Sequence, residues 1–429
     1  MSGLRLVRRS RWLLTGVVAL SLAATAAACG SGGSNGSPGP TGTAAAAAVL
    51  GAKNPAAGKP ITLGFISASA SDSPVSAQFK RVEAGLQMAR GYLNDYQGGI
   101  AGHPVQLFIC QGSETPAGSQ DCANQMVNKG VAAVVSAYSG QGAVITPILT
   151  KAGIPYVTLQ GSSSEEFTTP GAFTLTGGFP STLASYAQYA KDHGVKKFAL
   201  LTIDVPSAVQ GAQGIGTIVF KNAGVGYQVV TVPVGTPDMS SQLQSAASGG
   251  ADAIGVVGDL TFCAAWMQAY QTLGLSQAKY LLSTCIDPSN VKAYGPVING
   301  SVMSSIATTD LQNPDAKLYA AIAQTYGKDI NPDPNVSSGQ SGGATTLLSF
   351  ASALKGLTGD PTPAAVLAAF KATKNVPLFL GGGATFTCDG KQVSILPNIC
   401  SGDAQVGLLN NQGRLEKATL IHTAPLFTL

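Results

Sequence analysis

From residue 61 onward the chain alternates short apolar segments with longer amphipathic ones, and this alternation limits the possible folds. Residues 61–67 predict a strand, and over Ser76–Tyr96 apolar side chains recur every three or four positions, which is the spacing of one helix face. We expect further strands at 105–109, 131–137, 155–159, 197–203, 227–232, 253–257 and 279–283, and further helices at 119–128, 143–151, 182–192, 208–222, 240–247, 262–273, 341–356 and 363–373. Strands alternating with such helices form parallel sheets covered on both faces, so the sequence predicts an α/β fold.

The length of this region predicts two lobes. Residues 61–429 exceed what one hydrophobic core usually serves. After residue 373 the pattern changes to a glycine-rich, cysteine-bearing stretch, which predicts loops and short strands.

The N-terminal residues 1–28 have the pattern of an export signal. Four arginines between residues 5 and 11 precede the apolar run Trp12–Leu22, which is too short to cross a bilayer of about 30 Å. Ala26–Ala28 then precede Cys29, an arrangement that resembles the bacterial lipobox and predicts a lipoprotein signal peptide with lipidation at Cys29. The alternative is an ordinary secretory signal cut after Ala28, with Cys29 incidental. Residues 29–60, rich in Gly, Ser, Pro and Ala, predict a flexible tether.

Charge gives no reason to expect a nucleic-acid partner. The chain has 25 basic and 21 acidic residues, and the signal carries four arginines and no acid, so the remainder balances at 21 (25 − 4) against 21. A balanced surface does not favour binding to nucleic acid or to anionic membrane. After the signal, no apolar run approaches the 18 residues of a membrane-spanning helix.

Beyond Cys29 the chain has six cysteines, which favours an oxidising compartment. They are Cys110, Cys122, Cys263, Cys285, Cys388 and Cys400. Six cysteines allow 15 pairings; sequential pairing of neighbours is the simplest, and the sequence leaves the others open. There is no CxxC motif and the three histidines lie far apart, so we expect neither a metal nor another cofactor.

The loops that follow the predicted strands share a composition of hydroxyl and amide side chains with a few carboxylates. They are residues 67–73, 138–142, 160–164, 204–207, 259–261 and 284–287. In open parallel sheets, ligands bind beyond the carboxyl ends of the strands, so these loops predict a site for a small polar molecule. The alternative for each single residue is a helix N-cap.

Three local motifs carry a resemblance to a known family. NDYQGGIAGHPV at residues 94–105, GIPYV at 153–157 and DMSSQL at 238–243 resemble pieces of the type I periplasmic solute-binding family, particularly its branched-chain amino-acid branch. The resemblance implies two similar Rossmann-like lobes with parallel central sheets joined by a three-strand hinge, with solute trapped by hinge closure. Lobe 1 would span about 61–180 and 309–378, and lobe 2 about 181–308 and 379–429.

The same resemblance implies roles for individual residues. Ser139 and Ser162 would hold the carboxylate of an amino acid, and the carbonyl of Gln160 would face its amine. In lobe 2 the family places an acid against the amine, but here Cys285 stands at or beside that position. Either an aspartate replaces it or the solute has no ammonium group. The candidate ligand-binding residues are Ser71, Tyr138, Ser139, Gln141, Gln160, Ser162, Asp259, Thr284 and Asp287.

The expected function is that of a monomeric extracytoplasmic lipoprotein anchored to the cell membrane. It would capture a small polar solute, such as a branched-chain or other amino acid or an amide-like compound, and deliver it to a membrane ABC permease. The alternative is a ligand sensor for a membrane signalling partner.

An enzyme is not expected. Residues 339–343 match G-x-S-x-G, with His422 downstream, as in a serine hydrolase that would use Ser341. The hydrolase elbow needs a strand directly before the serine, and residues 331–338 instead contain two prolines and no strand pattern.

Overall fold

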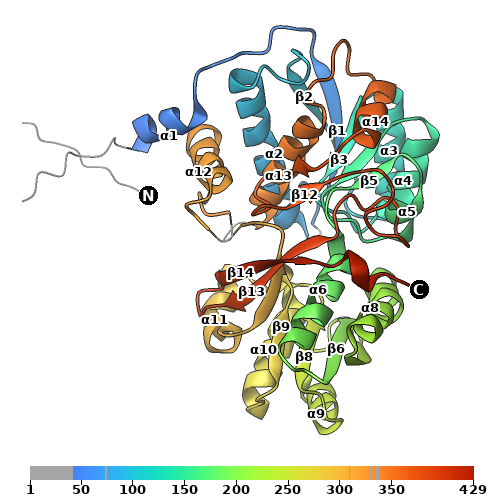
Figure 1. The fold of residues 1–429 in the computed structure, drawn as a ribbon, viewed down its shortest axis with the longest axis vertical. Coiled ribbons are helices and arrows are strands. Elements are labelled where there is room, and N and C mark those ends of the chain that lie inside the picture. Colours follow the sequence, from blue (N-terminus) through green and yellow to red (C-terminus); the bar gives the residue numbers. More distant parts are fainter. Residues whose placement is uncertain (1–41, 73–74, 309, 328–329, 335–337) are drawn as a thin grey trace, which may run out of the picture. The chain divides into compact units, whose positions relative to one another are not determined.

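The computed structural model describes residues 42–72, 75–308, 310–327, 330–334 and 338–429. The signal and Cys29 lie outside the described residues. Two separate sheets with helices on both faces organise the part from Gly42 onward into two lobes (Figure 1). The prediction of an α/β fold with parallel-sheet lobes is confirmed.

Lobe 1 contains a five-stranded parallel sheet in the order β2-β1-β3-β4-β5. Its strands are β1 (Ile61–Ser67), β2 (Val105–Gln111), β3 (Ala133–Ser136), β4 (Tyr156–Thr158) and β5 (Ala172–Thr174). Its helices are α2 (Ser76–Tyr96), α3 (Pro116–Lys129), α4 (Gly142–Lys151), α5 (Ser164–Thr168), α12 (Pro314–Tyr326), α13 (Ser338–Ala353) and α14 (Pro363–Lys371). Phe65 and Val135 face the core shared with α2, α12, α13 and α14, while Met126 and Ile145 of α3 and α4 cover the other face.

Lobe 2 contains a seven-stranded sheet in the order β14-β13-β10-β9-β8-β6-β7. Its strands are β6 (Lys197–Ile203), β7 (Gly226–Val232), β8 (Ala253–Val257), β9 (Ala278–Leu281), β10 (Val302–Ser305), β13 (Asp403–Leu409) and β14 (Leu415–His422). Its helices are α6 (Gly178–Asp192), α7 (Pro206–Gln210), a π-helical turn (Gly211–Gly216), α8 (Thr217–Ala223), α9 (Ser240–Ser248), α10 (Leu260–Leu273) and α11 (Pro288–Ile298). The first five strands in sequence are parallel, and β13 and β14 are antiparallel additions, where the sequence analysis expected loops and short strands.

Glycines allow helices α2 and α13 to pack closely. A Cβ built on Gly85 would lie 2.1 Å from the carbonyl oxygen of Gln340, and one built on Gly343 would lie 2.3 Å from that of Val82. Side chains at these positions would separate the two backbones. This close contact between the two backbones holds the start of α13 against α2.

In the part of the chain that the structure describes, three segments connect the two lobes. The first crossing joins β5 to α6 and the second joins β10 to α12, near the expected positions at 180 and 308. The third was expected near 378, but Leu380 and Phe386 pack in the core of lobe 1. Val393 and Leu396 then pack in the core of lobe 2. Cys400 still donates its N–H to Thr174 O of β5 in lobe 1, so the passage into lobe 2 is completed only at β13.

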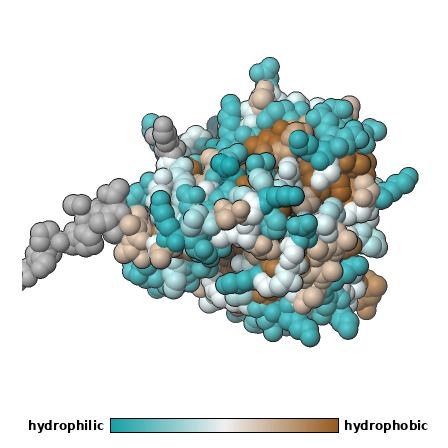
Figure 2. Space-filling model, turned by 90° about the horizontal axis from the view of Figure 1, so that it is seen from above, coloured by the Kyte–Doolittle hydropathy of each residue, from teal (hydrophilic) through white to brown (hydrophobic). Residues whose placement is uncertain are grey.

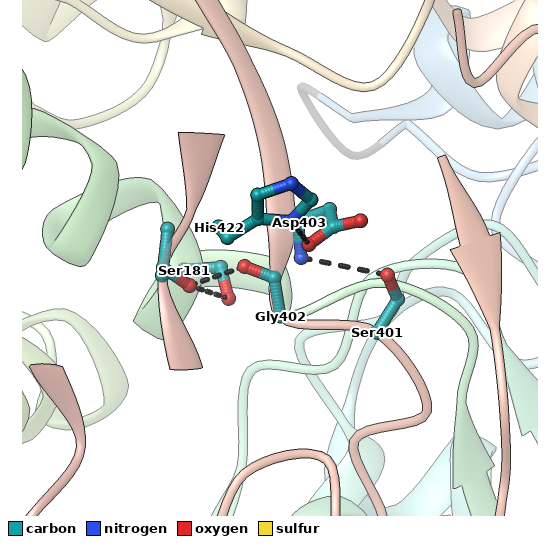
Figure 3. A network of polar contacts seen from close by, with 6 residues as sticks. Ser181, Ser401, Gly402, Asp403 and His422 are labelled. Atoms are coloured by element: carbon teal, nitrogen blue, oxygen red, sulfur yellow. Dashed lines mark hydrogen bonds and ion pairs between the residues drawn. The ribbon is translucent and has the colours of Figure 1, made fainter. Parts of the chain in front are cut away.

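A polar network holds the end of this third crossing (Figure 3). The Thr423 hydroxyl contacts the Ser181 hydroxyl of α6 at 3.1 Å and donates to the carbonyl of Gly402. One residue away on each strand, His422 Nδ1 lies 2.7 Å from Asp403 Oδ1. The network therefore joins β13 and β14 to the first turn of α6.

The segment expected to be a flexible tether is structured from Gly42 onward. Helix α1 (Gly42–Leu50) is alanine-rich, and alanine is the strongest helix former. It packs against α12, with Ala46 and Leu50 buried in the core of lobe 1. Asn54 follows the helix and donates its N–H to Asp95 O at 2.9 Å. The tether prediction for residues 29–60 is therefore corrected over 42–60, because apolar and backbone contacts attach that part to lobe 1.

Three disulfides join neighbouring cysteines, as sequential pairing predicted. They are Cys110–Cys122, Cys263–Cys285 and Cys388–Cys400. The first pair joins β2 to α3 in lobe 1, and the second joins α10 to the turn after β9 in lobe 2.

The surface shown in Figure 2 is mixed, with hydrophilic residues over much of the face and hydrophobic areas between them. Within the described residues, no helix has both the length and the apolar character needed to cross a membrane.

Candidate ligand-binding site

An interlobe cavity of about 300 Å³ lies where the carboxyl ends of strands from both sheets meet helix N-termini. It is lined by Gln78, Val82, Ala137, Tyr138, Leu159, Gln160, Gly161, Ser162, Gly178, Phe179, Thr182, Leu282, Ser283, Thr284, Ile286, Met303, Ser304, Ser305, Ile306, Ala307, Pro334, Gly339, Ser341, Gly342, Gly413 and Leu415. This is the position at which open parallel sheets bind ligands. Its volume suits a small solute.

The chemistry of the cavity wall is apolar with interspersed hydroxyl and amide groups. None of the described residues that line it carries a charged side chain. Burying an unpaired ammonium group against such a wall would be costly, because desolvation disfavours the charged form. The wall therefore favours a solute with an apolar body and hydrogen-bonding groups.

Four of the nine candidate binding residues line the cavity: Tyr138, Gln160, Ser162 and Thr284. Tyr138 follows β3, Gln160 and Ser162 follow β4, and Thr284 follows β9. Each comes from a loop at the carboxyl end of a strand, as the composition of those loops predicted.

The other five candidates do not line the cavity. The Ser71 hydroxyl donates to Ala68 O at 2.7 Å. Asp259 accepts from Phe262 N at 2.8 Å and so caps α10, and Asp287 accepts from Ser289 N at 3.0 Å at the start of α11. The two aspartates are therefore helix N-caps, which was the alternative stated for residues of these loops. Ser139 and Gln141 lie behind the wall and contact Glu114.

Glu114 holds the loop that carries Tyr138. The Ser139 hydroxyl donates to Glu114 Oε1 at 2.9 Å, and Gln141 Nε2 donates to the Glu114 carbonyl at 3.2 Å. Burial raises the pKa of Glu114, and the hydrogen bonds from Ser139 and the backbone of Gly140 oppose this. Sequence reasoning missed Glu114, because it lies before α3, far along the chain from the loop that it contacts.

Glu166 holds the loop that carries Ser162. Its carboxylate is fully buried and accepts from the N–H groups of Ser162 and Ser163, at 2.9 and 3.0 Å, and from the Ser163 hydroxyl at 2.9 Å. A Cβ on Gly142 would lie 2.2 Å from the Glu166 carboxyl carbon, so the first residue of α4 must be small. Burial raises the pKa of Glu166 more than these hydrogen bonds lower it.

Tyr138 is partly buried and lines the cavity, and its hydroxyl oxygen is buried. Its ring lies 5.3 Å from that of Phe79, and its hydroxyl has no hydrogen-bond partner within the described part of the chain. Burial, and secondarily the negative charge of Glu114, raises the pKa of Tyr138, so the hydroxyl stays protonated. A buried hydroxyl without a partner is available to a bound solute.

The wall from lobe 2 is held covalently. The Cys263–Cys285 disulfide joins α10 to the turn that contains Thr284. The Thr284 hydroxyl donates to Gly258 O at 3.1 Å, and Asn290 Nδ2 donates to Cys285 O at 3.1 Å. The turn after β9 is therefore fixed on both sides.

Several lining residues were not among the candidates. Ser304–Ala307 are the last two residues of β10 and the two that follow it. The sequence analysis did not assign this strand, because its sequence VMSS has no clear apolar alternation. Phe179 and Thr182 lie in the first turns of α6, and Gln78 and Val82 in α2. Only loops after assigned strands were considered, so residues from helix starts and crossings were missed.

Ser341 lines the cavity, but its surroundings do not form a hydrolase elbow. It lies in the first turn of α13, and the described residues 330–334 before that helix contain no strand. The glycines of its pentapeptide serve packing, since a Cβ on Gly339 would lie 2.8 Å from Arg81 Cβ and Gly343 faces α2. His422 pairs with Asp403 at the third crossing.

The match to a protein-family model decides the family. The model described as "Periplasmic binding protein" matches residues 60–395. The chain belongs to the periplasmic binding protein family. Members of this family are solute-binding proteins of the ABC-transporter type and not enzymes. The resemblance noted in the sequence is confirmed.

Solved structures of this periplasmic binding protein's relatives share its fold at low identity. LivJ from Streptococcus pneumoniae, in complex with isoleucine, is 19% identical over 85% of this chain and 99% of its own, with a TM-score of 0.68. A solute binding protein of an ABC transporter from Rhodopseudomonas palustris HaA2, in complex with p-hydroxybenzoic acid, is 17% identical over 86% and 99%, with a TM-score of 0.70. A fatty acid ABC transporter substrate-binding protein from Thermomonospora curvata is 14% identical over 87% and 94%, with a TM-score of 0.67. No curated protein matches the chain by sequence.

Proposed function

We propose that the interlobe cavity captures a small solute with an apolar body, which the protein delivers to an ABC permease in the cell membrane. The observation that carries this proposal is the cavity itself, which joins both lobes and has an uncharged described wall. Isoleucine, p-hydroxybenzoic acid and the fatty acid named for three similar structures each have an apolar body. An interlobe ligand contacts both lobes, so its binding favours the closed arrangement.

Thermal unfolding with a panel of solutes tests this proposal. The panel would contain apolar amino acids, aromatic acids, amides and alcohols. A solute that binds only the folded protein must raise the unfolding midpoint, and calorimetry then gives its dissociation constant. No midpoint change across the panel would contradict the proposal.

A cavity-filling variant makes the test specific to this site. Gly342 lines the cavity, and a Cβ there would lie 3.6 Å from Ala137 Cβ, an ordinary contact. Gly342→Leu should therefore fold, fill part of the cavity and abolish the solute-dependent shift. Gly214→Leu is the matched control, because Gly214 is exposed and a Cβ there meets no atom within 4 Å. Binding that survives Gly342→Leu would place the site elsewhere.

We also propose that Cys29 carries a lipid that anchors the protein at the extracytoplasmic face of the cell membrane. The support is the sequence pattern before Cys29, since that residue lies outside the described part of the chain. Cys29→Ser should move the protein from the membrane fraction to the aqueous fraction, while the control Ser37→Ala should leave it bound. An unchanged distribution would favour an ordinary signal peptide.

A further inference from the structure

We propose that Glu114 determines the specificity of the interlobe cavity. Its carboxylate accepts the hydrogen bond of the Ser139 hydroxyl, so the site selects solutes with a neutral polar group near this loop over solutes with a carboxylate near this loop. This inference rests on the proposed solute-binding function and concerns which solutes bind. It differs from the family resemblance, which implied that Ser139 and Ser162 hold a ligand carboxylate.

The first support is that the Ser139 donor is already used. Its hydroxyl is 2.9 Å from Glu114 Oε1, and the residue is 5% exposed. The other carboxylate oxygen lies beside Gly140, because a Cβ built there would be 3.6 Å from Glu114 Oε2. A solute carboxylate at this loop would have to displace Glu114 or share its donors, and two close carboxylates repel each other.

The second support is that the backbone is held in an unfavourable conformation to present Glu114. Ser113 and Glu114 have φ angles of 56° and 51°, the left-handed region that favours glycine. Consecutive non-glycine residues there are strained, and strain of this kind persists where surrounding contacts enforce it. The hydrogen bond from Gln141 Nε2 to the Glu114 carbonyl is such a contact.

The third support is that the donors of the neighbouring loop are also used. The Ser162 hydroxyl donates to Ser139 O at 3.1 Å, and its N–H donates to Glu166. The chain therefore satisfies both serines that would have held a carboxylate. On this side of the cavity, the Tyr138 hydroxyl is buried and has no partner among the described residues.

Tyr138 can donate to a carbonyl or hydroxyl oxygen of a neutral solute. Arg81 is the nearby cation that would attract a carboxylate instead, and its charge acts on Tyr138 together with that of Glu114. The influence of Glu114 on Tyr138 is the larger of the two.

Matched pairs of solutes test this inference. Benzamide with benzoate and isovaleramide with isovalerate, together with longer and shorter pairs, differ in the charge of one group. Calorimetry on the full mature chain should show each amide binding at least about tenfold tighter than its carboxylate, a difference of about 1.4 kcal/mol. Glu114→Gln keeps an acceptor for Ser139 and removes the charge, so it should reduce this preference about tenfold. Glu165→Gln, a partly exposed carboxylate on α5, is the matched control and should leave the preference unchanged.

Two further variants test the inference even if Glu114→Gln does not fold. Tyr138→Phe should weaken amide binding about tenfold, whereas the control Glu165→Gln should leave it within about twofold. Tighter binding of the carboxylates by the wild type, lost in Ser139→Ala, would overturn the inference and leave the proposed function standing. Failure of every solute to bind the wild type would overturn both.

Discussion

The two walls of the interlobe cavity are held by different chemistry. In lobe 1, carboxylates hold the loops: the half-buried Glu114 contacts the loop after β3, and the fully buried Glu166 holds the loop after β4. In lobe 2, a disulfide holds the turn after β9, and Asp259 and Asp287 cap helices near the surface. The carboxylates of Glu114, Glu166, Asp259 and Asp287 all accept hydrogen bonds from donors of the protein itself. We therefore assign none of the four to the binding of a cationic group on the solute.

This difference predicts what disturbs each wall. The lobe 1 wall depends on hydrogen bonds that become unsatisfied if a carboxylate is removed. The lobe 2 wall depends on a covalent bond, so it should be sensitive to reduction and tolerant of changes at its aspartates.

The largest effect is expected from removing the Cys263–Cys285 disulfide. For a separation of 22 residues, the Cys263→Ala/Cys285→Ala variant should lose about 3 kcal/mol of unfolding free energy in urea. Solute affinity should fall as well, because Thr284 lines the cavity beside this bond. The matched control is Cys388→Ala/Cys400→Ala, because no residue between these two cysteines lines the cavity. It should lose similar stability and keep its affinity. Equal losses of affinity in both variants would contradict the distinction between the walls.

The sequence predicted the strands and helices around the cavity better than it predicted the residues that line the cavity. Ser76–Tyr96 and residues 61–67 were predicted with their observed bounds, because long apolar periodicities report which face is buried. Tyr138, Gln160 and Ser162 were predicted to lie near one another because the ends of parallel strands meet at one edge of a sheet, and all three line the cavity.

Contacts between loops that lie far apart along the chain could not be predicted from the sequence. Ser139 meets Glu114 across 25 positions, and no local pattern marks that pair. Likewise, α1 was expected to be part of a tether because its alanines have little apolar surface, yet packing against α12 buries Ala46 and Leu50. Tertiary contacts decided both outcomes.

A smaller effect is expected from the caps of lobe 2. Asp259→Ala removes the acceptor for Phe262 N and should cost about 1 kcal/mol, measured by urea unfolding. Solute affinity should stay the same, because Asp259 does not line the cavity. Asp259→Asn, which keeps a capping oxygen, is the control and should recover most of the stability. A loss of affinity in Asp259→Ala with unchanged stability would instead indicate a direct contact with the solute.

The smallest effect concerns the pH dependence of the lobe 1 wall. Burial raises the pKa of Glu166, so the folded protein keeps a proton on this carboxyl to higher pH than the unfolded chain does. The stability that this proton contributes is complete below the carboxyl pKa of the unfolded chain, about 4.3, and is lost as the pH rises through the higher pKa of the folded state. Glu166→Gln cannot titrate. Between pH 4 and pH 7, its thermal midpoint should therefore rise relative to that of the wild type.

Glu165→Gln is the control for this comparison. Glu165 is a partly exposed neighbour on α5 that accepts from the Ser164 hydroxyl at 3.0 Å. Its midpoint should follow that of the wild type across the same pH range. If the difference for Glu166→Gln stayed constant with pH, or moved in favour of the wild type, the hydrogen bonds from Ser162 and Ser163 would outweigh burial. In that case Glu166 would hold its loop as a stable carboxylate, and lobe 1 would depend on charge more strongly than its buried position implies.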